Sequence, residues 1–154
     1  MSTDGLLDAA IADLCERFDK NGYNPTPIID LGVLVANADG VVDEAEVTAL
    51  RGIFQRLLGE QIDAELVGHL VDASREVIDA AGVGPRLRLL AEILQDCDAV
   101  EQGITVALGV AYASEGLSAS ERTLVSELAG AAGLPDGRLE ELIESVRAQS
   151  ERET

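Results

Sequence analysis

Apolar residues recur every three or four positions along most of the chain, as they do on one face of an α-helix. Four stretches have this spacing: Leu7, Ile11, Leu14 and Phe18; Val47, Leu50, Phe54 and Leu57; Leu66, Leu70, Ala73 and Val77; and Leu139, Leu142, Ile143 and Val146. No stretch alternates between apolar and polar residues as a half-buried strand would. The pattern therefore predicts an all-α fold, a compact helical bundle of seven or eight helices.

Two further segments, residues 28–38 and 100–113, are apolar on nearly every side. A helix of this composition has no face suited to water, so both segments are predicted to be central helices that the others surround. Gly32 in the first segment, and Gly103 and Gly109 in the second, are small enough to let a neighbouring helix come close.

The two central segments are followed by similar turns, which indicates an internal repeat. Residues 35–46 read VANADGVVDEAE and residues 111–121 read AYASEGLSASE, so each turn carries an acid directly before a glycine. We therefore predict a single domain over residues 1–154. Its parts are an additional N-terminal helix, 1–20, and two pseudo-symmetric halves, about 28–80 and 98–148.

Each turn is followed by the spacing of a capping box, in which a short polar side chain and a glutamate three residues later bond each other's backbone amides. The two pairs are Asp43 with Glu46, and Ser118 with Glu121. Helix capping is therefore one explanation of these residues. It does not explain the acids before the glycines, Asp39 and Glu115, although Asp-Gly is also a common turn pair.

The first turn also resembles part of a calcium-binding loop, which has ligands at positions 1, 3, 5, 7, 9 and 12 and glycine at 6. With Gly40 at position 6, the sequence places Asn37 at 3, Asp39 at 5, Asp43 at 9 and Glu46 at 12. Position 1 is a valine, which cannot bind a cation, so a regular EF-hand is not expected. A divalent ion held in another geometry is consistent with these oxygen donors.

Charge narrows the function further, because 29 acidic and only 11 basic residues give a formal net charge of −18. Such a surface repels phosphate groups, so we expect no nucleic-acid binding. The longest strongly apolar run, residues 104–113, is about half the length that crosses a bilayer, so we expect no membrane insertion. Cys15 and Cys97 lie far apart and the N-terminus lacks a secretory pattern, which predicts a cytoplasmic protein.

The sequence contains no recognisable set of catalytic residues. His69 is the only histidine, so neither a common zinc site nor a nucleophile activated by histidine can be assembled. Residues 82–84 read Gly-Val-Gly, without the preceding strand or third glycine of a dinucleotide-binding turn. We therefore expect no enzymatic activity, no catalytic residues and no cofactor other than a divalent metal ion.

Residues 36–40 read ANADG, and residues 115–118 read EGLS. These paired turns resemble the tellurite-resistance TerB family, whose domain also occurs in DjlA-type co-chaperones. The resemblance covers about residues 28–146. It implies an all-helical bundle with pseudo-twofold halves and an acidic patch that binds metal ions or docks other stress-response components. The positions that it assigns to this patch are Asp39, Asp43, Glu46, Glu115 and Glu121.

The acidic residues allow two interpretations. In the first, the protein is a non-catalytic stress-response module that binds a divalent metal ion through the five acids of this patch. In the second, it is a protein-interaction scaffold without a metal site, and its negative surface docks a basic partner. Both interpretations include protein partners, and the sequence sets no oligomeric state.

Overall fold

The computed structural model describes residues 4–23, 26–38, 44–58, 64–112 and 117–152, and almost all of them are helical. The helices are α1 (Asp4–Lys20), α2 (Thr26–Ala36), α3 (Glu44–Leu58), α4 (Ala64–Ala81), α5 (Val83–Asp96), α6 (Val100–Ala111), α7 (Ala119–Ala131) and α8 (Asp136–Arg152). These ranges contain no strand. The predicted all-α bundle of seven or eight helices is therefore confirmed.

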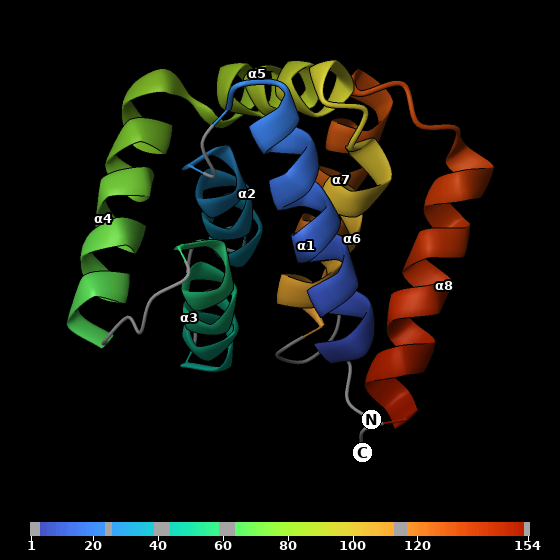
Figure 1. The fold of residues 1–154 in the computed structure, drawn as a ribbon, viewed down its shortest axis with the longest axis horizontal. Coiled ribbons are helices and arrows are strands. Elements are labelled where there is room, and N and C mark those ends of the chain that lie inside the picture. Colours follow the sequence, from blue (N-terminus) through green and yellow to red (C-terminus); the bar gives the residue numbers. More distant parts are fainter. Residues whose placement is uncertain (1–3, 24–25, 39–43, 59–63, 113–116, 153–154) are drawn as a thin grey trace.

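Helices α2 and α6 lie at the centre of the bundle, as their all-round apolar sequences predict. Every residue of α2 from Ile28 to Ala36 is buried, and so are most residues of α6. Helix α6 packs against α1, α2, α3, α5, α7 and α8. Figure 1 shows the surrounding arrangement, in which α5 lies across one end of the bundle while α4 and α8 stand at opposite edges.

Glycines bring the central helices close to their neighbours. A Cβ atom built on Gly32 would lie 2.7 Å from Cδ2 of Leu50 on α3. A Cβ atom built on Gly103 would lie 2.7 Å from both terminal carbons of Leu94 on α5. Both distances are too short for a real carbon–carbon contact, so these glycines allow α2 and α6 to approach α3 and α5 closely.

The N-terminal helix is part of the same hydrophobic core. Ile11, Leu14 and Phe18 of α1 are almost completely buried, and α1 packs on α6. A polar contact joins the two helices as well, because the Gln102 side-chain amide donates to a carboxylate oxygen of Asp13 at 2.8 Å. The helix that the sequence marks as an addition is therefore integrated into the core.

Helix α4 buries a different face from the one on which its apolar residues are spaced. Val71, Ser74 and Ile78 point inward, whereas Leu66 and Val77 are 43% and 41% exposed. The orientation of α4 depends on a residue of α2. Asp30 is the one charged residue of that otherwise apolar helix.

Asp30 is only 4% exposed, and two side chains from neighbouring helices satisfy it. The hydroxyl of Ser74 on α4 donates to Asp30 Oδ1 at 2.8 Å, and the Arg86 guanidinium of α5 donates to Oδ2. A buried carboxylate requires such partners. The requirement for Ser74 thus fixes the rotation of α4 about its own axis.

Among the described helices, none combines the length and the apolar character that crossing a membrane requires.

Candidate functional site

The five acids of the predicted patch are described to different extents. Asp39, Asp43 and Glu115 lie outside the described residues. Glu46 and Glu121 each occupy the third position of their helices, α3 and α7. The two glutamates therefore hold the same position in the two helices that follow the acidic turns.

Glu121 forms the capping box that its spacing predicts. Its backbone N–H donates to the Ser118 hydroxyl oxygen at 3.1 Å, and its Oε1 accepts from the Ser118 backbone N–H at 2.9 Å. Glu121 is also 4% exposed. The capping interpretation is confirmed for this pair, so the burial and one oxygen of Glu121 are explained by the start of α7.

The end of α2, which precedes the first turn, lies beside α7, which follows the second turn. A hollow of about 160 Å³ is lined by Leu34, Asn37 and Ala38 from the end of α2, Ile78 and Val83 from α4 and α5, and Ser120, Thr123, Leu124 and Glu127 from α7. The chain thus enters the first acidic turn beside the helix that follows the second turn. In the other direction, α3, which follows the first turn, packs against α6, which precedes the second.

Asn37 contributes an oxygen to this region. Its side-chain Oδ1 is buried and has no hydrogen-bond partner within the described part of the chain. A buried amide oxygen without a donor is unfavourable, whereas a cation would satisfy it. Asn37 is also the residue at position 3 in the comparison with a calcium loop.

No cluster of three or more Asp, Glu, His or Cys side chains suited to a metal occurs among the residues that the structure describes. His69 is exposed on α4. The metal interpretation therefore depends on Asp39, Asp43 and Glu115.

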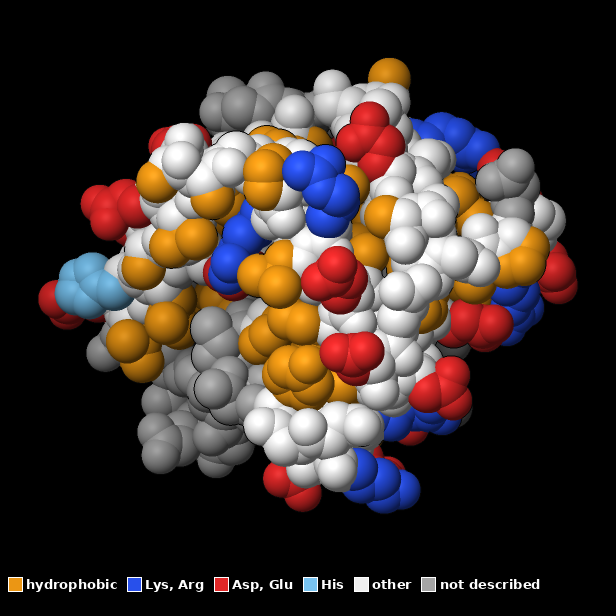
Figure 2. Space-filling model, turned by 90° about the horizontal axis from the view of Figure 1, so that it is seen from above, with side chains coloured by type: hydrophobic (Ala, Val, Ile, Leu, Met, Phe, Trp, Pro, Cys, Tyr) orange, Lys and Arg blue, Asp and Glu red, His pale blue; other side chains and the backbone are white. Residues whose placement is uncertain are grey.

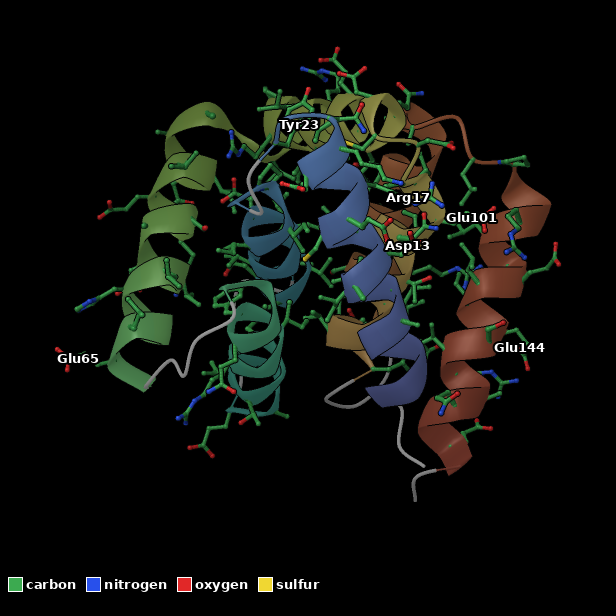
Figure 3. All side chains as sticks on the ribbon, viewed as in Figure 1. Asp13, Arg17, Tyr23, Glu65, Glu101 and Glu144 are labelled. Atoms are coloured by element: carbon green, nitrogen blue, oxygen red, sulfur yellow. The ribbon has the colours of Figure 1, made fainter. Side chains whose placement is uncertain are left out.

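A second hollow, of about 270 Å³, lies between α1, the start of α6 and residues 132–134 after α7, and its charged residues are paired. Arg17 Nε donates to Asp13 at 2.9 Å, and Arg138 donates to Glu101 at 2.7 Å (Figure 3). These hydrogen bonds hold the pKa values of the Asp13 and Glu101 carboxyls below their usual range. Because both guanidinium groups are paired with carboxylates, this hollow is poorly suited to an anion.

The two cysteines have the character of structural rather than reactive thiols. Cys97 is buried and Cys15 is half-buried, and both are free. Burial raises the pKa of both thiols above the ordinary value. Since the thiolate is the nucleophile, little of either side chain is reactive at neutral pH.

We therefore expect Cys97 to react with a soluble disulfide reagent at pH 7.5 at least about tenfold more slowly in the folded protein than in denaturant. Absorbance of the released thiolate measures both rates, and a Cys15→Ser variant isolates Cys97. As the pH rises, the reaction rate of the folded protein should still increase at pH values where the rate of the denatured chain has levelled off. Equal rates in both states would show that Cys97 is accessible and has an ordinary pKa.

Comparison with known proteins gives one match. The family model described as "Tellurite resistance protein TerB" matches residues 26–146, from the first residue of α2 into the last turns of α8. Searches of curated proteins and of solved structures found no significant match. The matched region contains both central helices and the sequences of both acidic turns, and it leaves out α1 and the last residues of α8. The chain therefore belongs to the TerB family of tellurite resistance proteins.

Proposed function

We propose that this TerB module is a non-catalytic binding protein that holds a divalent cation beside the hollow between the end of α2 and α7, with ligands from both acidic turns. The observation that carries the proposal is the shared hollow, which is lined by Asn37 and Ala38, directly after α2, and by Ser120 of α7. This contact supports a site to which both turns contribute. The buried oxygen of Asn37, which has no hydrogen-bond partner among the residues that the structure describes, supports it independently.

The ligands in this proposal are the carboxylates of Asp39, Asp43, Glu46 and Glu115 together with the amide oxygen of Asn37. Carboxylate and amide oxygens are the donors that Ca²⁺ and Mg²⁺ prefer. Glu121 has a supporting role in this assignment, because one of its oxygens already accepts from the Ser118 amide. It would hold the second turn in position from the start of α7.

Metal binding should raise the melting temperature of metal-stripped protein in a saturable way. A ligand at a hundred times its dissociation constant stabilises the folded state by about 2.7 kcal/mol. For a chain of this size that corresponds to a rise of roughly 5–10 °C. Thermal melts with calcium, magnesium, manganese and zinc would measure it, and an Asp39→Asn, Glu46→Gln variant should lose the rise.

Two controls separate a site from general screening of the −18 charge. Potassium chloride at equal ionic strength should not reproduce the effect of the divalent ion. An Asp72→Asn, Glu76→Gln variant removes the same charge from exposed positions on α4 and should keep the full rise. If every salt acts alike, or both variants respond equally, the acids of the turns do not form a cation site.

A further inference from the structure

A continuous apolar stripe runs along the outside of α4. It consists of Leu66, Leu70, Ala73, Val77 and Ala80, and we call it the α4 stripe. Leu66, Ala73, Val77 and Ala80 are exposed, and Leu70 is half-buried. The residues are spaced alternately four and three positions apart, which is the spacing of a seam that packs against another helix. Figure 2 shows hydrophobic side chains exposed on this flank of the molecule.

Only Leu70 of the α4 stripe packs against the core, and its other four residues stay exposed. The inward face of α4 is set by Val71, Ser74 and Ile78, and Ser74 bonds to the buried Asp30. Burying the stripe would require α4 to turn by about 100°, one residue position. That turn would withdraw the Ser74 hydroxyl from Asp30, so the exposure of the stripe is built into the fold.

The shape of the α4 stripe suits a helical partner. It extends over about four turns of helix, roughly 21 Å at 1.5 Å per residue. Ala73 and Ala80 are small, so a second helix could approach closely, at about 8 Å between the axes. Leu66 and Val77 supply the larger side chains that such a helix would pack between.

The charges beside the α4 stripe define the partner further. The solvent-facing side of α4 carries four exposed acids, which are Glu65, Asp72, Glu76 and Asp79. His69 is also exposed on this helix. Glu65 projects away from the bundle at the far end of the helix (Figure 3). A second copy of this chain would bring the same acids and a second charge of −18 against this flank, which like-charge repulsion disfavours. A partner with lysine or arginine at these positions would be attracted.

We propose that the α4 stripe is the docking site for an amphipathic helix of a partner protein, with an apolar seam flanked by lysine or arginine. The stripe supplies the apolar contact, and Glu65, Asp72 and Glu76 pair with the basic flank. This inference rests on α4 alone and does not depend on whether the acidic turns bind metal.

Synthetic helices of about 20 residues test the proposal directly. The first peptide carries leucine along one seam and lysine on both sides of it. The second replaces each lysine with glutamate, and the third scrambles the first. Fluorescence anisotropy with the full chain should show saturable binding of the first peptide, at least about tenfold tighter than that of either control.

Variants on α4 locate the binding surface. The double variant Ala73→Gln, Val77→Gln removes apolar surface from exposed positions. It should lower the affinity for the first peptide at least about tenfold. Leu89→Gln changes an exposed leucine of α5 outside the stripe and should leave binding unchanged. Asp72→Asn with Glu76→Gln should weaken binding mainly at low salt. Unchanged melting temperatures would show that all three variants fold.

Several results would overturn the proposal. Equal binding of the scrambled peptide would mean that net charge alone attracts it, and equal binding of the glutamate peptide would mean that the acids select nothing. Dimerisation of the wild-type chain that Val77→Gln abolishes in sedimentation would assign the stripe to a second copy. If the chain binds phosphatidylcholine vesicles and Val77→Gln abolishes this binding, the stripe binds lipid instead of a helix.

Discussion

Replacing Phe18 with alanine is expected to lower the free energy of unfolding by about 3–5 kcal/mol. Phe18 is among the largest fully buried side chains, and it also contacts the Tyr23 ring, with 5.9 Å between the ring centroids. Its removal leaves a cavity between α1 and the rest of the core. Urea unfolding followed by circular dichroism measures the loss.

The informative control is Phe54→Ala on α3, because Phe54 is equally buried but lies inside the region that matches the family. We expect similar losses from the two substitutions, since both side chains belong to one core. A loss below about 1 kcal/mol for Phe18→Ala, with a normal loss for Phe54→Ala, would show that α1 is only loosely attached. The N-terminal helix, which lies outside the family match, would then contribute little to the stability of the fold.

Replacing Asp30 with alanine is expected to cost about 3 kcal/mol, the second largest effect. The substitution leaves the Ser74 hydroxyl buried without its acceptor and the Arg86 guanidinium without its carboxylate. Arg86 is half-buried, and a charge at such a position is less favourable unpaired than paired. The same urea titration measures this change.

Asp30→Asn separates the contributions of charge and hydrogen bonding. The amide keeps an oxygen for the Ser74 hydroxyl but loses the charge that pairs with Arg86, so an intermediate loss is expected. Ser74→Ala should cost about 1 kcal/mol, the usual value of one neutral hydrogen bond. If Asp30→Ala costs no more than Ser74→Ala, the ion pair with Arg86 contributes nothing to the fold.

Hydrophobic spacing predicted the architecture well because helix formation and burial follow local patterns. The all-round apolar character of residues 28–38 and 100–113 predicts two central helices, and α2 and α6 occupy these segments at the centre of the bundle. The cap spacing of Ser118 and Glu121 predicted a capping box that the structure contains. In each case the sequence signal lies within a short stretch of the chain.

The face that α4 buries could not be predicted in this way. Its rotation depends on a hydrogen bond between Ser74 and Asp30, which lie 44 positions apart. Spacing alone detects the apolar residues of α4 without revealing which of them meet the core. The available signal was Asp30, a lone acid in an apolar helix, since a charge there requires polar partners from neighbouring helices.

The proposed cation site is the part that remains a prediction. Acids are so numerous in this sequence that their abundance distinguishes no position. The repeat selected Asp39 and Glu115, and both lie outside the described residues. What the structure adds is Asn37, whose buried oxygen lacks a partner in the part of the chain it describes.

The separation of the two faces of α4 has a consequence for how this protein can change over evolutionary time. Substitutions at exposed sites usually alter stability by less than about 0.5 kcal/mol. Because Val71, Ser74 and Ile78 anchor α4 from its inward face, mutations at the exposed positions of the stripe can accumulate without endangering folding. Descendants of this chain could therefore acquire new binding specificities on α4 while the bundle beneath it is preserved.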